Sequence, residues 1–225
     1  MSLAERLAER VAELQARIRR ACEAAGRDPG SVELLPVSKK QPLALIREAA
    51  ALGFTRFGEN YVQEGADKAL ALPDLGFVLL GPLQRNKARA ALQHFVEIQS
   101  IDRPELIERL RRLAEELALV RPVWIQVDLW DEATKLGGCT EGEVPLLIAA
   151  LGGDVRLPLQ GFMAIPPPED EGAFARMADL RERLQQELGQ PLRLSMGMSG
   201  DLEAAIAAGS DQIRIGTAFF GERSY

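Results

Sequence analysis

The sequence predicts an α/β protein, a single (β/α)8 barrel of the TIM type with one extra helix at its N-terminus. Short apolar segments that resemble buried strands alternate along the whole chain with amphipathic helical segments, and eight such strands can be counted. No linker or low-complexity stretch interrupts the pattern. A length of 225 residues is common for one barrel domain, so we expect a single domain over residues 1–225.

An open, doubly wound sheet is the competing fold. It would need helices on both faces of the sheet and usually has fewer strands, and no GxGxxG motif follows the first strand of this chain. The barrel is therefore the preferred prediction.

The extra helix is expected within residues 1–26. Ser2 and Glu5 fit a capping box, and Gly26 is a stop signal. Apolar residues recur between them at helical spacing: Leu3, Leu7, Val11, Leu14 and Ile18. Because this helix precedes the first strand, we expect it to pack on the barrel and cover its bottom.

Each strand is expected where a short apolar run is bounded by glycine, proline or charged residues. These runs cover residues 33–40, 54–58, 77–81, 95–99, 122–128, 157–164, 192–195 and 212–215.

The helices are expected between the strands, where apolar residues recur with a helical period. Pro42 opens the first of them and Gly53 ends it, and the Asp102–Glu105 pattern suggests a capped start for another. The expected helices cover residues 42–52, 60–72, 83–92, 102–117, 141–151, 174–188 and 201–208.

Composition excludes several classes of function. A net charge of -6 argues against binding nucleic acid over a broad surface. Cys22 and Cys139 lack the CxxC spacing of a zinc site, and a single histidine, His94, argues against triads and His-ligated metal sites. We expect His94 to be a surface or capping residue.

The N-terminus is charged from its start, and no apolar run approaches the length needed to span a bilayer. We therefore expect a cytoplasmic protein with no membrane partner.

Two adjacent lysines, Lys39 and Lys40, stand at the end of the first strand. Lys and Arg total 27, but only five of these residues are lysine, so the pair is unusual for this chain. A lysine at a strand end can have its stem in an apolar wall, where burial supplies the neutral amine that a Schiff base requires. The alternative is that both lysines are solvated charges at a strand end.

The last two loops predict an anion site. Ser199 and Asp201 open a helix after the seventh strand, and Gly216 and Thr217 follow the eighth. Backbone N–H groups and hydroxyls in such loops form a phosphate cradle, and barrels commonly bind phosphate after strands seven and eight. The alternative is that Ser199 is a plain helix cap and Gly216 a plain turn.

A Schiff-base lysine that faces a phosphate cradle suits either a sugar-phosphate aldolase or a site for pyridoxal 5'-phosphate (PLP). Arg214 favours PLP, because a cation at the pyridine nitrogen keeps that atom unprotonated. Arg214 could instead form an ion pair inside the barrel mouth with Asp128 or Glu59.

Six segments together resemble the pyridoxal phosphate homeostasis protein family, whose barrel is similar to the N-terminal domain of alanine racemase. They are VSK at 37–39, FGENYVQE at 57–64, GPLQRNK at 81–87, GFMAIP at 161–166, LSMGMSGD at 194–201 and RIGTAFFG at 214–221. The match extends over nearly the whole chain.

The resemblance implies PLP as the cofactor, held as a Schiff base on Lys39. It places Arg214 near the pyridine nitrogen and Asn60 near the ring. The other implied residues hold the phosphate or line the pocket: Ser199, Gly216, Thr217, Met196 and Met198. Apolar packing explains the two methionines equally well. Pro82 and Gln99 stand where the family usually has histidine.

The resemblance also implies a carrier that regulates intracellular PLP and amino-acid pools without robust catalysis, with PLP-dependent apo-enzymes as possible partners. A barrel without an appended domain makes a monomer the default expectation. Racemisation needs a second base beside Lys39. The tyrosines are Tyr61 and Tyr225, and neither is a convincing candidate. An amino-acid racemase of the alanine racemase type is the alternative, and a PLP-free barrel acting on a sugar phosphate is a third hypothesis.

Overall fold

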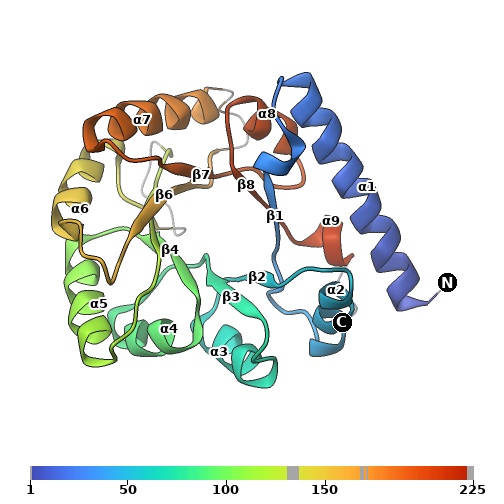
Figure 1. Cartoon of the computed structure of the whole chain (residues 1–225), viewed down its shortest axis with the longest axis horizontal. Helices are drawn as coiled ribbons and strands as arrows, with labels where there is room; N and C mark the ends of the chain where they lie inside the picture. The colour runs from blue at the N-terminus through green and yellow to red at the C-terminus, as the bar shows by residue number, and fades with distance from the viewer. Residues whose placement is uncertain (1, 131–136, 168–169, 171, 222–225) are drawn as a thin grey trace.

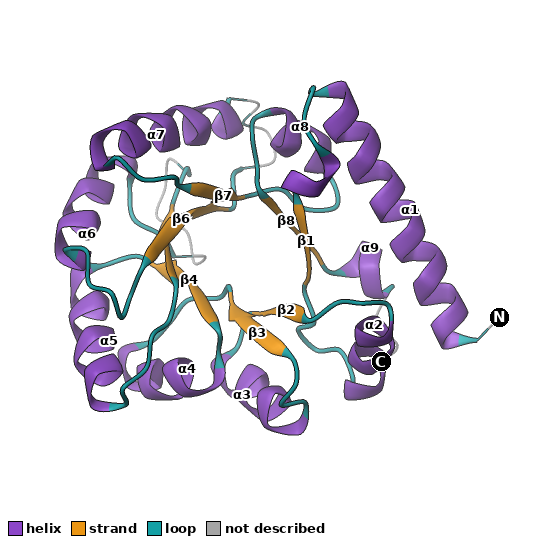
Figure 2. Ribbon diagram, in the orientation of Figure 1, coloured by secondary structure: helices purple, strands orange, loops and turns teal. Residues whose placement is uncertain are grey.

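The computed structural model describes residues 2–130, 137–167, 170 and 172–221. In this part of the chain, eight parallel strands form one sheet in the order β1-β8-β7-β6-β5-β4-β3-β2. A bridge between Val37 and Gly58 joins the two ends of the sheet and closes it into a barrel. Helices surround the barrel, which confirms the predicted fold (Figures 1 and 2).

The strands are β1 (Glu33–Pro36), β2 (Arg56–Glu59), β3 (Gly76–Leu79), β4 (Glu97–Ile101), β5 (Val123–Val127), β6 (Leu159–Ala164), β7 (Arg193–Ser195) and β8 (Gln212–Ile215). The helices are α1 (Leu3–Ala24), α2 (Leu43–Ala51), α3 (Val62–Ala71), α4 (Ala88–His94), α5 (Pro104–Glu116), α6 (Val144–Leu151), α7 (Ala173–Leu188), α8 (Leu202–Ala207) and α9 (Thr217–Phe220). Short 3-10 turns lie at η1 (Pro29–Ser31), η2 (Arg85–Lys87) and η3 (Glu141–Glu143).

Several predicted boundaries are wrong by a few residues. Strand β4 begins two residues later than expected because the apolar Phe95 belongs to the end of α4, where its N–H bonds to Ala91 O at 3.0 Å. The helix expected from residue 60 begins at Val62, since Tyr61 remains extended. Asp102 does not cap α5. It pairs with Arg103 instead, at 2.5 Å.

The capping box of α1 is confirmed, because Ser2 Oγ accepts from the Glu5 N–H at 3.2 Å and the Glu5 carboxylate accepts from the Ser2 N–H at 2.6 Å. The expectation that this helix covers the barrel's bottom is wrong. It packs along the outside against α8, α9 and α2 (Figure 1). Its apolar stripe, which includes Leu7 and Val11, joins the core there.

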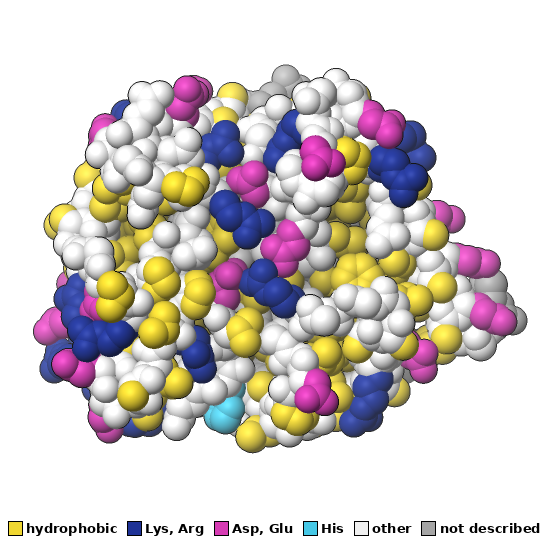
Figure 3. Space-filling view, viewed as in Figure 1, with side chains coloured by type: hydrophobic (Ala, Val, Ile, Leu, Met, Phe, Trp, Pro, Cys, Tyr) yellow, Lys and Arg dark blue, Asp and Glu magenta, His cyan; other side chains and the backbone are white. Residues whose placement is uncertain are grey.

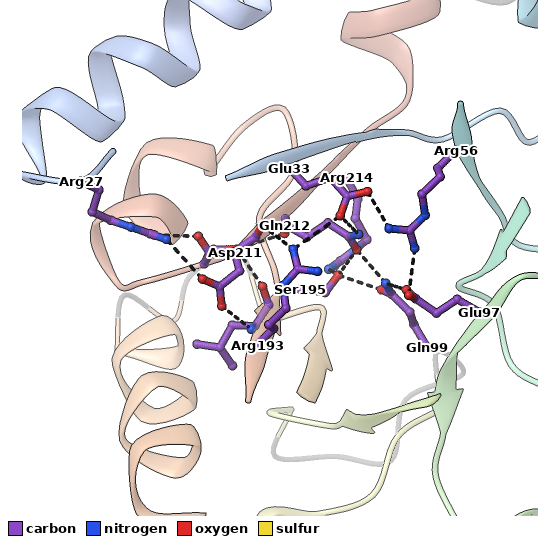
Figure 4. Close-up of polar contacts among 12 residues, drawn as sticks. Arg27, Glu33, Arg56, Glu97, Gln99, Arg193, Ser195, Asp211, Gln212 and Arg214 are labelled. Atoms are coloured by element: carbon purple, nitrogen blue, oxygen red, sulfur yellow. Dashed lines mark hydrogen bonds and ion pairs between the residues drawn. The ribbon is translucent and has the colours of Figure 1, made fainter. Parts of the chain in front are cut away.

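Ion pairs fill the N-terminal end of the barrel instead. The first residues of β1, β2 and β4 are Glu33, Arg56 and Glu97. The Arg56 guanidinium pairs with Glu33 at 2.9 Å and with Glu97 at 2.8 Å (Figure 4). Acidic and basic side chains also alternate across the middle of one face of the molecule (Figure 3). Charged side chains of this kind are a poor surface for the apolar stripe of α1.

The alternation of side chains along β1 sets the direction of Lys39. Leu35 and Val37 form a small buried cluster with Val78 and Leu80, so odd-numbered residues of this segment face the barrel interior. Pro36 and Ser38 consequently face the surrounding helices, and the next inward residue is Lys39. Among the described residues, no helix has the length and apolar character needed to cross a membrane.

We predict that Gly81→Ala destabilises the protein. A Cβ at Gly81 would lie 2.0 Å from the backbone oxygen of Asn60, so the loops after β2 and β3 would have to separate. Overpacking of this kind costs about 1–3 kcal/mol, which thermal unfolding would register as a lower Tm. Gly142→Ala is the matched control, because nothing lies within 4 Å of the added Cβ. Equal Tm values for the two variants would contradict the prediction.

Candidate ligand-binding site

A cavity of about 280 Å³ lies at the carboxyl end of the barrel. Its lining residues come from the ends of six strands and the loops after them: Val37, Lys39, Asn60, Leu80, Met163, Ile165, Met198, Ser199, Arg214, Gly216 and Thr217. A larger hollow of about 380 Å³ lies near α6 and β6, but Asp154 is the one ionisable residue in its described lining. Two other hollows, of about 610 and 520 Å³, contain charged residues, but they lie against α3 and between α1 and α8. The carboxyl-end cavity holds the candidate chemistry because it lies at the strand ends, where barrels place their sites.

The cavity brings together almost all the site residues proposed from the sequence. Met196 is the exception. It follows Ser195, whose side chain faces the barrel interior, so Met196 faces the opposite way and is fully buried in the hydrophobic core. Met198 and Met163 line the cavity instead.

The two adjacent lysines lie in different environments. Lys39 is half-buried and lines the cavity, whereas Lys40 is exposed and does not line it. Lys40 has a φ of +59°, a left-handed conformation that is uncommon for a residue other than glycine. The interpretation as a solvated charge therefore fits Lys40 but not Lys39.

A buried polar network lies on the outer side of the barrel wall behind Lys39. The Lys68 ammonium contacts Glu59 Oε1 at 2.7 Å, Glu64 Oε1 at 2.7 Å and the carbonyl oxygen of Ser38 at 2.6 Å. Burial raises the pKa of the Glu59 carboxyl, while Lys68 and the Ser38 hydroxyl oppose that rise. Sequence reasoning missed this network, although Glu64 and Lys68 have the i,i+4 spacing of a helical ion pair.

The anion-binding candidates lie in the loops after β7 and β8. Ser199 is not the cap of α8, because Asp201 holds that position and its Oδ1 accepts from the Met198 N–H at 2.5 Å. Gly216 caps α9, and Thr217 begins that helix. Ser199, Gly216 and Thr217 thus meet at one side of the cavity.

Helix α1 contacts the loop after β7 from outside the barrel. Arg17 donates from Nη1 to the carbonyl oxygen of Ser199 at 2.7 Å and pairs with the Glu203 carboxylate through Nε and Nη2. Arg17 lies 182 residues from Ser199 in the sequence, so sequence patterns gave no signal for this contact.

Arg214 lies at the floor of the cavity, held by neutral groups. Its guanidinium donates to Ser195 Oγ at 2.9 Å and to the carbonyl oxygen of Ala164 at 2.8 Å. Of the two ion-pair partners considered from the sequence, Asp128 and Glu59, Glu59 pairs with Lys68 instead. Burial lowers the pKa of Arg214 to about 10, so the side chain remains charged at neutral pH.

Ser195 belongs to a chain of polar side chains that runs down the barrel interior (Figure 4). Its hydroxyl lies 2.8 Å from Gln99 Oε1 and 2.9 Å from Gln212 Oε1. Gln99 and Gln212 in turn donate to Glu97 and Glu33 at the charged end of the barrel, at 2.6 and 3.0 Å. Gln99 therefore supports Arg214 through Ser195 and does not line the cavity.

The other residues considered from the sequence lie outside the cavity lining. Pro82 and Tyr61 are exposed, and His94 is a half-exposed residue that ends α4. Tyr225 lies outside the described residues.

The arrangement has three chemical capabilities. An amine at the cavity wall can condense with a carbonyl group, small residues and hydroxyls opposite it can hold an anion, and a buried cation below can donate to an acceptor atom. Arg has five N–H donors, of which the contacts to Ser195 and Ala164 use two. The remaining donors suit a planar ligand that carries an acceptor atom.

Comparison with known proteins identifies the family. Residues 10–224 match the family model for the N-terminal domain of alanine racemase. The chain is 45% identical to the pyridoxal phosphate homeostasis protein of Pseudomonas aeruginosa, over 97% of this chain and 96% of that protein. It is 41% identical to the protein of the same name from Escherichia coli K12, over 97% of each chain.

Solved structures agree with this assignment. PipY of Synechococcus elongatus with PLP bound is 40% identical, with a TM-score of 0.80 over 96% of this chain and all of that one. The crystal structure of an unknown protein from Bifidobacterium adolescentis is 31% identical in sequence with a TM-score of 0.89, covering 96% of this chain and 95% of that one. Together these matches show that the chain belongs to the pyridoxal phosphate homeostasis proteins, within the alanine racemase N-terminal domain family.

Proposed function

We propose that this protein binds PLP as a Schiff base on Lys39 and serves intracellular PLP homeostasis as a carrier without robust catalysis. The observation that carries the proposal is the convergence of Lys39, the Ser199 and Thr217 loops and Arg214 on one cavity. The PLP bound to PipY and the names of the relatives support the same ligand.

The residues present fit this cofactor. The amine nitrogen of Lys39 would bond to the aldehyde carbon, and the aldehyde oxygen would leave as water. Ser199, Gly216 and Thr217 would hold the phosphate, and Asn60 would lie near the ring. When bound, PLP supplies an electron sink for carbanions formed next to an amino group.

Arg214 favours a carrier over a strong catalyst. Since its guanidinium remains charged at neutral pH, it would donate to the pyridine nitrogen and keep that atom unprotonated. An unprotonated ring is a weaker electron sink. The described cavity lining also contains no carboxylate, imidazole or phenol that would act as a second base opposite Lys39.

We further propose a cytoplasmic monomer that meets amino acids and PLP-dependent apo-enzymes as partners. An amino-acid racemase with Lys39 as one base is the alternative function.

The Schiff base is tested by substitution of the two adjacent lysines. Lys39→Ala is expected to abolish the visible absorbance of the PLP-loaded protein, while Lys40→Ala retains it, because Lys40 is exposed outside the cavity. Borohydride reduction and peptide mapping would then locate the pyridoxyl group. A pyridoxyl group on Lys40, or a protein that takes up no PLP, would refute the assignment. The second result would favour a sugar phosphate as the ligand.

The proposed phosphate binding by the Ser199 loop is tested by substitution of Arg17, which donates to the Ser199 carbonyl oxygen from outside the cavity. Arg17→Ala is expected to weaken PLP binding about tenfold, the loss of one charge-assisted bond, and to leave binding of pyridoxal unchanged because that ligand lacks the phosphate. Equilibrium titration of both ligands measures the ratio. Arg27→Ala is the matched control, since Arg27 bonds to Ser210 O at 2.6 Å, at the other end of α8. A similar loss for both ligands would contradict the assignment.

The carrier role is tested by turnover. We expect PLP-loaded protein incubated with L-alanine to form D-alanine no faster than Lys39→Ala does, as measured by chiral chromatography. Sustained formation of D-alanine by the wild type alone would establish the racemase alternative.

A further inference from the structure

The two peptide groups that flank Lys39 are both held by one buried network. On the N-terminal side, the carbonyl oxygen of Ser38 accepts from Lys68 Nζ at 2.6 Å. On the C-terminal side, the N–H of Lys40 donates to Glu64 Oε1. Lys68 and Glu64 contact each other at 2.7 Å, so one ion pair on helix α3 holds the backbone before and after Lys39.

The network is anchored in the barrel wall. Lys68 is 6% exposed and Glu59, the last residue of β2, is fully buried. The Glu59 carboxylate accepts from Lys68 Nζ at 2.7 Å and from the Ser38 hydroxyl at 2.6 Å. Charge-assisted hydrogen bonds of this length are stronger and more directional than neutral ones, particularly away from water.

The backbone of Lys40 has an unusual conformation that is accompanied by a bond to this network. Its φ of +59° places a residue with a side chain in the left-handed region, which is unfavourable for residues other than glycine. In this conformation its N–H reaches the Glu64 carboxylate. The chain therefore turns away immediately after Lys39, while the side chain of Lys39 faces the cavity.

We propose that Lys68 and Glu64 form a positioning clamp for Lys39. They hold its main chain so that the ε-amine meets the ligand aldehyde without further ordering of the backbone. The clamp contacts the peptide groups beside Lys39 from outside the barrel, so Lys68 and Glu64 are positioning residues and not catalytic ones. This role rests on the proposed function, because it concerns formation of the Schiff base.

The clamp predicts a selective defect. Lys68→Met and Glu64→Leu should each weaken PLP binding about tenfold and slow Schiff-base formation, because the amine is no longer held in place. Binding of pyridoxine 5'-phosphate should change by less than about twofold, since this alcohol contains the ring and the phosphate but has no aldehyde to react with Lys39. Titration of both ligands and stopped-flow absorbance provide the measurements.

A conservative variant and a control variant distinguish a loss of Lys39 positioning from a general loss of folding stability. Glu64→Gln retains an oxygen that can accept from the Lys40 N–H, so its rate of Schiff-base formation should lie closer to the wild type than that of Glu64→Leu. Asp67→Leu is the control on the same helix, because Asp67 bonds to Gln63 at 3.0 Å and is exposed. If Lys68→Met fails to fold, Glu64→Leu and Glu64→Gln still decide the question, because Glu64 is only partly buried.

The outcomes distinguish the two proposals. Equal losses for PLP and pyridoxine 5'-phosphate, or a Glu64→Leu variant that reacts at the wild-type rate, would overturn the clamp and leave PLP binding intact. A wild-type protein that binds PLP but never forms a Schiff base would overturn the proposed linkage and the clamp together.

Discussion

The seam between β1 and β2 is the constraint on which the site depends. Most neighbouring strands share two or more paired residues, but these two meet through the Val37–Gly58 bridge and the hydrogen bond from Ser38 N to Gly58 O at 2.8 Å. Lys39 follows directly after this closure. A short seam offers little backbone pairing, so side chains must hold it. The buried contacts of Lys68 with Glu59 and Ser38 cross the seam at this height.

Burying such a network is costly, which suggests that it serves a purpose beyond stability. The free-energy cost of desolvating two charges offsets much of their Coulombic attraction. Apolar replacements of buried ion pairs are therefore often neutral or stabilising. Glu59 Oε2 also has no hydrogen-bond partner in the described structure. An apolar contact would have closed the seam at lower cost. It would not have held the peptide groups on both sides of Lys39.

The sequence predicted residues whose position follows from strand order and alternation. Lys39, Ser199 and Arg214 stand at or just beyond strand ends, and parallel strands in a barrel bring those ends together. Met196 was misplaced because alternation was not applied to it: Ser195, the last residue of β7, faces the barrel interior, so Met196 faces the opposite way. Lys68 and Arg17 were missed for a different reason. Their roles consist of bonds to backbone carbonyls 30 and 182 residues away, and side-chain patterns carry no record of such contacts.

The two ends of the cavity differ in a way that suits an exchangeable cofactor. The floor is rigid, because Arg214 is buried and held by Ser195, which Gln99 and Gln212 support in turn. The rim is open, since Thr217 is exposed and Met198 is 40% exposed. A rigid floor favours recognition of the ring, whereas a rim near solvent would give water or an incoming amine access to the proposed Schiff base on Lys39. In a catalyst that access would admit side reactions that enzymes exclude by closing the site. In a carrier the same access provides the route by which the ligand leaves.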